Sequence, residues 1–229
     1  MSKSIVLFFL IFPLLQFSQT VNDANDIDTH YLEDQFYLGV NYNFMLNKPN
    51  NVVQRNFSYG LQAGIIRDLP LNVQRNFGLG IGVGYAVNSY YTNLISTTTN
   101  GIISYSVASS DFKFDRSKFE IHSIELPIEL RWRNSTPTDY KFLRIYSGIK
   151  FGYNFSTRSK LVTNDGGEGF ANPDIEKFQY GLTFNLGYNT FNLHLYYSLS
   201  DFLKNDTVLD TGDIIVMKPL RIGLIFYML

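Results

Sequence analysis

The chain has 229 residues, of which 17% are charged and 16% aromatic, and its formal net charge is −1. This near-neutral charge, with no clustered run of Lys and Arg, excludes the usual basic nucleic-acid-binding proteins. The chain has no cysteine, which excludes disulfides, thiolate nucleophiles, cysteine-ligated metals and a lipid-anchored amino-terminal cysteine. Few charges and many aromatics are typical of alternating strands whose outer face is apolar.

The amino terminus has the pattern of a secretory signal peptide over residues 1–18. Lys3 precedes the apolar run IVLFFLIFPLLQF at 5–17, which is too short to span a bilayer as a helix and therefore argues against an uncleaved anchor. We place the cleavage after Ser18, although Gln16 is larger than the residue usually found two places earlier. The mature chain is expected to cross the inner membrane.

Residues 19–34 are polar, acidic and without periodicity, so they are expected to form a flexible periplasmic leader. Asp23, Asn25, Asp26 and Asp28 are oxygen-bearing residues that could suggest a calcium site. The glycine and the closing glutamate of an EF-hand loop are missing, so a solvated linker is the better interpretation.

From residue 36 onward, large apolar residues alternate with small or polar ones, which is the period of a β-strand. Each segment reaches the about 9 to 11 residues that cross a bilayer when tilted. The predicted strands cover residues 36–46, 57–65, 77–87, 118–133, 142–155, 178–188, 191–203 and 218–229. Aromatic residues near the strand ends fit two interfacial girdles, with Phe77, Trp132, Tyr188 and Phe191 at one end and Phe44, Phe155, Tyr180 and Tyr197 at the other.

The predicted connections alternate between short and long, as in outer-membrane barrels. The short ones are 69–76, 134–141 and 189–190, and the long ones are 47–56, 93–117, 156–177 and 204–217. A soluble barrel such as a lipocalin would leave the apolar face wet, at a cost of about 25 cal/mol per Å2. The sequence therefore predicts an all-β fold, an eight-stranded antiparallel transmembrane β-barrel over 35–229, in the outer membrane with both termini periplasmic.

The stretch FGLGIGVGYAV at 77–87 contains four alternating glycines. A dinucleotide-binding turn needs the spacing G-x-G-x-x-G followed by a helix, and neither is present. The glycines are better explained as an inner barrel wall with almost no side chains, which leaves room for bulky groups on other strands. The predicted wall consists of Gly60, Gly64, Gly78, Gly80, Gly82 and Gly84.

Several charged residues fall on the polar, inward phase of their strands. An eight-stranded barrel is filled by its own side chains, so these charges are expected to pair in a structural network. A ligand or proton path is the alternative. The predicted network consists of Glu125, Glu129, Arg131, Arg133, Arg144, Lys150 and Arg221.

His122 and Ser123 lie where the apolar phase of the fourth strand slips, which predicts a β-bulge. An enzyme that modifies lipid A at the barrel rim could use a His and a Ser. Adjacent strand residues face opposite ways, however, and no third acidic partner is evident. His194 is expected to form hydrogen bonds inside the barrel. We therefore predict no catalytic, cofactor-binding or metal-binding residues, and no enzyme.

Two external features are expected among the long connections. The segments 89–95 and 101–108 are typical of a hairpin that extends beyond the membrane. TNDGGEGFANPD at 163–174 has turn composition and predicts a mobile loop. Asp165 and Glu168 in it could take a cation, but a plain loop is the simpler interpretation.

The segment HSIELPIELRWRNSTPTDYKFLRIYSGIKFGYNF, residues 122–155, resembles the PorT family of small outer-membrane barrels of Bacteroidetes, called SprT in gliding bacteria. The resemblance covers roughly residues 34–229. It implies a component required for the type IX secretion system, which exports proteins with a conserved C-terminal domain, and for gliding motility where present.

A filled barrel would act in that system as an accessory or assembly factor and not as the conduit. The expected partners are outer-membrane lipid or lipopolysaccharide and other secretion-system proteins, with no nucleic acid, small-molecule substrate or cofactor. Two alternatives stay open. One is a stand-alone surface adhesion barrel of the OmpX kind, and the other is the rim enzyme.

Overall fold

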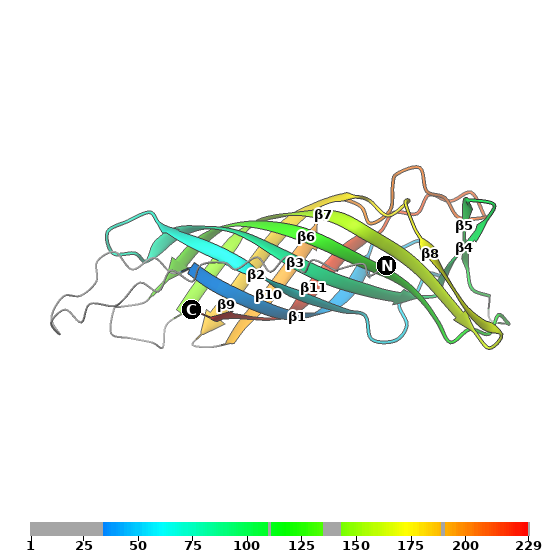
Figure 1. Cartoon of the computed structure of the whole chain (residues 1–229), viewed down its shortest axis with the longest axis horizontal. Coiled ribbons are helices and arrows are strands. Elements are labelled where there is room, and N and C mark those ends of the chain that lie inside the picture. Colours follow the sequence, from blue (N-terminus) through cyan, green and yellow to red (C-terminus); the bar gives the residue numbers. More distant parts are fainter. Residues whose placement is uncertain (1–33, 110, 135–142, 189–190, 229) are drawn as a thin grey trace, which may run out of the picture. The chain divides into compact units, whose positions relative to one another are not determined.

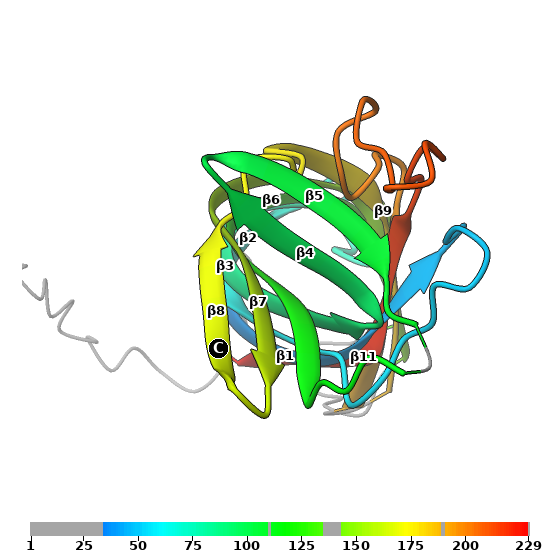
Figure 2. The ribbon, with the colours of Figure 1, turned by 90° about the vertical axis from the view of Figure 1, so that its right-hand side faces the viewer.

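Eight long antiparallel strands close into a barrel in the computed structural model, which describes residues 34–109, 111–134, 143–188 and 191–228. The barrel strands are β1 Asp34–Leu46, β2 Tyr59–Pro70, β3 Phe77–Thr92, β6 Arg116–Arg133, β7 Leu143–Thr163, β9 Phe178–Tyr188, β10 Phe191–Ser198 and β11 Lys218–Met228. They follow the order β6-β3-β2-β1-β11-β10-β9-β7, and pairing of β6 with β7 closes the ring (Figures 1 and 2). The predicted fold class is confirmed.

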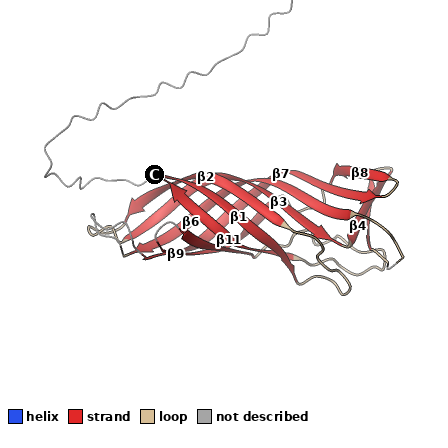
Figure 3. Ribbon diagram, turned by 90° about the horizontal axis from the view of Figure 1, so that it is seen from below, coloured by secondary structure: helices blue, strands red, loops and turns tan. Residues whose placement is uncertain are grey.

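The described residues form strands and loops (Figure 3). None of the described residues forms a helix long and apolar enough to cross a membrane. The predicted signal peptide, nearly all of the predicted leader and most of two predicted turns, 134–141 and 189–190, lie outside the described residues.

The two ends of the barrel differ in their connections. Phe36 in β1 pairs with Met228 in β11, so the barrel begins and finishes at the same end, where residues 71–76 join β2 to β3. We call this the short-turn end. The opposite, long-loop end carries the connections 47–58, 93–115, 164–177 and 199–217. The described connections therefore follow the predicted alternation of short and long.

The outer surface of the barrel is apolar through its middle. In β9, Leu182 is 47% exposed, whereas its neighbour Thr183, which faces inward, is 1% exposed. The predicted girdle residues face outward at the two ends of this band. Ile145, which pairs with Trp132, and Phe155 are ten residues apart along β7. Ten strand residues rise roughly 25 Å at about 3.3 Å per residue and a tilt of about 40°. That is the height expected of a lipid-facing band.

Above this band, towards the long-loop end, the polarity of the barrel reverses. Here the inner face is apolar, and Phe119 and Tyr90 pack edge-on against Phe202 at 5.6 and 5.1 Å between ring centroids. The buried residues of this apolar cap are Met45, Val52, Tyr90, Leu94, Tyr105, Phe119, Ile121, Ile175, Phe202, Leu203, Leu209, Ile215 and Met217. The outer face of β6 carries Lys118 and Glu120 instead. This part of the chain thus follows the rule for water-exposed proteins, with apolar residues inside.

The apolar cap corrects one prediction. Phe119 and Ile121 face inward, on the same side of β6 as Ser123 and Glu125. The alternation of inward and outward side chains along β6 is therefore uninterrupted. A register shift does occur at His122 and Ser123, but Phe155 on β7 is the extra residue, because Ser123 pairs with Asn154 and His122 with Ser156. The bulge was predicted at the right level and on the wrong strand.

A small two-stranded sheet stands at the long-loop end. It consists of β4, Leu94–Thr99, and β5, Ile102–Val107, which agrees with the predicted hairpin except that residues 89–92 belong to β3. In Figure 2 these two strands cross the mouth of the ring. The Tyr105 hydroxyl lies 3.0 Å from Asp174 Oδ2 and accepts a hydrogen bond from Asn172 at 2.9 Å. Burial raises the pKa of Tyr105, as expected where little water enters.

Further predicted boundaries at the long-loop end are wrong. The fifth predicted strand ends at residue 155, whereas β7 continues to Thr163. Residues 166–171, predicted as part of a loop, form β8, Gly166–Ala171, which pairs with Arg158–Thr163 of β7. The seventh predicted strand extends to residue 203, whereas β10 ends at Ser198. Phe202 and Leu203 instead turn into the apolar cap, where they are 0% and 1% exposed. Their burial explains the apolar pattern that suggested a longer strand.

Candidate functional site

The barrel interior holds the predicted charges in three groups. In the first, Glu125 of β6 binds two cations, with Oε2 at 2.9 Å from Lys150 Nζ and Oε1 at 2.7 Å from Arg221 Nη1. All three residues are at most 5% exposed. Lys150 also donates to Gln62 Oε1 at 2.7 Å, and the Arg221 guanidinium lies 4.4 Å from the Tyr196 ring centre. This group joins β2, β6, β7, β10 and β11 through the lumen.

The second group surrounds Arg131. Its Nε lies 3.2 Å from Glu129 Oε2, its Nη1 donates to Gln35 Oε1 at 3.1 Å, and it lies 4.4 Å from the centre of the Tyr146 ring. Glu129 also accepts a hydrogen bond from Asn185 at 3.1 Å. Since Arg131 is 1% exposed, its charge is compensated by these neighbours and not by water.

The third group closes the short-turn end. Arg133 Nη1 lies 2.8 Å from Asp68 Oδ2, and Arg133 Nε donates to the carbonyl oxygen of Arg75 at 2.9 Å. Arg144, the register partner of Arg133, also faces inward. Asp68 was not among the predicted charges because the second strand was expected to end at residue 65. Its even spacing from Gln62 is the signal that would have found it.

The predicted glycine wall lies against large side chains from other strands. A Cβ atom on Gly80 would lie 2.5 Å from Arg131 Nε, and one on Gly64 would lie 2.6 Å from Tyr37 Cζ. Gly84 also faces the Tyr37 ring. The remaining wall glycines lie against Asn43 and Asn88 (Gly60), Asp68 (Gly78) and Ile66 (Gly82). These contacts inside regular strands leave no turn in which a phosphate could be bound.

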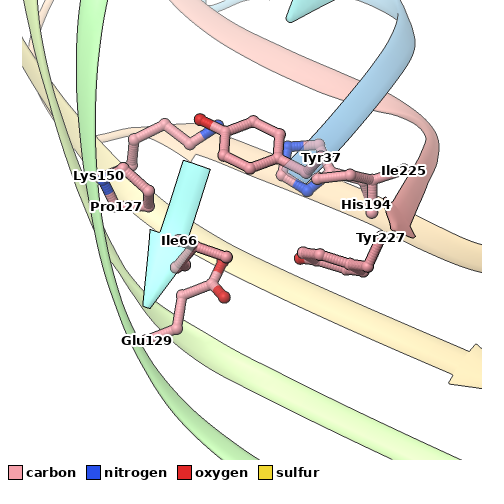
Figure 4. A pocket seen from close by; sticks show the side chains of 8 residues that line it. All are labelled: Tyr37, Ile66, Pro127, Glu129, Lys150, His194, Ile225 and Tyr227. Carbon is pink, nitrogen blue, oxygen red and sulfur yellow. The ribbon is translucent and has the colours of Figure 1, made fainter. Parts of the chain in front are cut away.

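A very small space remains in the middle of the lumen. Figure 4 shows Tyr37, Tyr227, His194, Lys150 and Glu129 converging on it from different strands. Its volume is about 10 Å3, close to the smallest space that holds a water molecule. His194 Nδ1 lies 2.5 Å from Asn185 Oδ1, the hydrogen-bonding position predicted for it. A small-molecule ligand has no room here.

His122 and Ser123 do not form a catalytic pair. His122 faces outward, where its Nδ1 lies 2.6 Å from the Tyr85 hydroxyl, while Ser123 faces the interior and is 2% exposed. The acidic partner that the sequence did not reveal is Glu120, with Oε1 at 3.6 Å from His122 Nε2. Its spacing of two residues on one strand face was the missed signal. Asp165 and Glu168 are exposed, and no group of three or more His, Asp or Glu within the described ranges could hold a metal ion.

Replacing Glu129 with alanine is expected to lower the free energy of unfolding by about 2–3 kcal/mol, because Arg131 loses a charged hydrogen-bond partner while keeping Gln35 and Tyr146. The measurement is heat-modifiability on gels, in which the folded barrel should convert to the unfolded band at a lower temperature. An unchanged conversion temperature would contradict a stabilising role for the second group.

The family comparison agrees with the barrel fold. A family model described as outer membrane protein beta-barrel domain matches residues 17–204. No curated protein matches the chain. Two similar solved structures are of Ail, the attachment invasion locus protein of Yersinia pestis, one in complex with the heparin analogue sucrose octasulfate and one described without it. Both are 11% identical and cover 86% of this chain and 99% of their own, with TM-scores of 0.34 and 0.32.

Proposed function

We propose, from the premise that the chain belongs to the outer membrane protein β-barrel domain family, that it is an accessory or assembly component of protein secretion across the outer membrane. The resemblance of residues 122–155 to the PorT family gives the specific system, type IX secretion, with gliding motility where present. In this proposal the long-loop end faces outward, and both barrel termini are periplasmic. The filled interior is the observation that carries the accessory role.

Two independent blocks in the lumen support an accessory role over a conduit. The ion pairs of Glu125 with Lys150 and Arg221 connect strands through the lumen within the lipid-facing band. The apolar cap fills the barrel above them, with Phe119 and Phe202 both 0% exposed. Opening a path would leave several charges without partners and expose the cap to water, and both changes cost free energy. The barrel would therefore act through its surfaces.

The surface best suited to protein partners lies at the long-loop end. Ile102 in β5 is 71% exposed, and Ile214 in the last long loop is 59% exposed. Phe112 before β6 is 43% exposed. Contiguous apolar patches outside the lipid band are typical of interaction sites, and we assign these residues to such a patch. The partners would be other secretion-system proteins.

The test is deletion of the gene followed by measurement of secreted cargo with the type IX C-terminal domain. The deletion strain is expected to lose secretion of this cargo. The wild-type chain should restore secretion, whereas an Ile102→Ser, Ile214→Ser variant that still inserts in the outer membrane should not. The control is a Leu199→Ser variant, which changes an exposed apolar residue immediately after β10. Normal secretion with altered surface binding would contradict the proposal and favour the adhesion alternative.

The same strain tests the rim-enzyme alternative. Replacing His122 and Ser123 together with alanine is expected to leave the composition of lipid A unchanged, because the two side chains face opposite sides of β6. A change in lipid A acylation in this variant would contradict that expectation.

Affinity purification of the native protein from mild detergent is the experiment that identifies the protein partners.

A further inference from the structure

Basic side chains gather on the outer wall of β6 and β7 above the lipid-facing band. Lys118 of β6 pairs in register with Lys160 of β7, and Glu120 pairs with Arg158. Arg116 lies two residues beyond Lys118 on the same face of β6 and is exposed. We call Arg116, Lys118, Arg158 and Lys160 the basic patch. In Figure 1 these parts of β6 and β7 lie towards the end that carries β8.

The bulge in β7 determines the direction of half of this patch. Below the bulge, the odd-numbered residues of β7, such as Tyr153, face outward. Above the bulge, even-numbered residues, among them Arg158 and Lys160, face outward. Phe155 is the extra residue that changes the phase. Without it, Ser159, now 0% exposed, would face outward, and the two cations would face the apolar cap. Bulges commonly redirect side chains in this way.

The patch surrounds a hollow of about 130 Å3, lined by Lys118, Glu120, Arg158, Ser159, Lys160 and Gly169. Gly169 of β8 is the register partner of Lys160, and its lack of a side chain helps to keep the hollow open. The hollow thus has room for a small anionic group beside three cationic side chains.

The patch has an excess of positive charge. Glu120 is the one carboxylate that lines the hollow, and it is already engaged by Lys118 at 2.5 Å and by His122 at 3.6 Å. Among the described residues, Arg158 and Lys160 form no salt bridge. Four cations against one carboxylate leave charge that an anion would neutralise.

The height of the patch points to the kind of anion. Tyr85 and Tyr153 lie at the upper edge of the lipid-facing band, and both are 45% exposed. Arg158 is five residues beyond Tyr153 along β7, one of which is the bulge residue. The remaining four rise roughly 10 Å at about 3.3 Å per residue and a tilt of about 40°. This is the layer of lipid headgroups, immediately above the aromatic girdle.

We propose that the basic patch is a binding site for the phosphate groups of the anionic glycolipid in the outer leaflet, the lipid A part of lipopolysaccharide. The proposal rests on the outward orientation of the long-loop end given above. Arg158 and Lys160 bind the phosphate, Lys118 lines the hollow beside them, and the aromatic rings below contact the acyl chains. The site fixes the barrel to the lipid on one side, at β6, β7 and β8.

The experiment measures thermal unfolding of the purified full-length barrel in detergent micelles. The probes are diphosphoryl lipid A, lipid A without its phosphates, and inorganic phosphate. Diphosphoryl lipid A is expected to raise the midpoint, and the other two probes are expected to raise it by less than half as much. The variant Arg158→Gln, Lys160→Gln should lose most of the increase, whereas Lys48→Gln, Lys204→Gln, with cations at other long loops, should keep it.

Several results would overturn the site. Equal stabilisation by lipid A without phosphates would show that the acyl chains alone are recognised, and equal stabilisation by inorganic phosphate would show that the ligand is a free ion. A full increase in the Arg158, Lys160 variant would remove these residues from the site. Heat-modifiability of each variant without lipid establishes that it has folded. Cargo secretion is not part of this measurement, so failure of the lipid site and failure of the proposed secretion role are distinguishable.

Discussion

Replacing Glu125 with alanine is expected to lower the free energy of unfolding by about 4 kcal/mol, because it leaves two buried cations without their carboxylate. Lys150 and Arg221 are 3% and 5% exposed, so water cannot easily replace Glu125. The hydrogen bond from Lys150 to Gln62 compensates only one of them. The measurement is urea-induced unfolding in phospholipid vesicles, followed by the shift of the folded band on gels.

The matched control is Glu120→Ala on the same strand. Glu120 also binds a lysine, Lys118, but its side chain is 25% exposed and lies above the lipid-facing band. Ion pairs that water can reach contribute about 0–1 kcal/mol, so this variant should unfold close to the wild type. Similar losses for Glu125→Ala and Glu120→Ala would contradict the assignment of Glu125 to a dry, structural network.

Replacing Gly148 with alanine is expected to destabilise the barrel by about 3 kcal/mol. A methyl group at this position would overlap the carbonyl oxygen of Ile128 and lie 2.7 Å from the Cα of Glu129. Both are backbone atoms of β6, so relief requires the two strands to separate. The expected result is a lower urea midpoint, or loss of the folded band if assembly fails.

Gly152→Ala is the control for this substitution. Gly152 also lies on the inward phase of β7, and the nearest atom to an added Cβ would be the carbonyl oxygen of Gln179 at 3.6 Å, an ordinary contact. Alanine is moreover favoured over glycine within a strand by about 0.5–1 kcal/mol. This variant should be as stable as the wild type or slightly more stable. Equal destabilisation at 148 and 152 would contradict a specific packing role for Gly148.

The sequence was sufficient to predict the barrel because strand period and membrane chemistry act together. Leu182 and Thr183 are an example, since the apolar Leu182 faces the lipid and the polar Thr183 faces the lumen. The alternating glycines also indicated from the sequence that part of the inner wall carries almost no side chains. Which side chain fills the space beside each glycine depends on register between strands distant in sequence. The contact of Gly80 with Arg131 is an example.

The errors lie where the surroundings of the barrel change. Phe119 and Ile121 face inward above the lipid band, whereas Ile124 and Leu126 face outward beside the lipid, so the apolar residues of β6 change face where the surroundings change. The alternation in β6 is uninterrupted, and the phase change is in β7 at Phe155. A single strand pattern cannot reveal which of two partners carries an extra residue. The predicted signal peptide over 1–18 stays a prediction.

The most direct test of the filled interior is the electrical conductance of the purified barrel in planar lipid bilayers, with heat-modifiability used to verify that it is folded. The ion pairs of Glu125 and the apolar cap predict that the current stays at the level of the bare bilayer after insertion. Discrete and reproducible conductance steps from the wild-type barrel would contradict a blocked lumen and, with it, the accessory role.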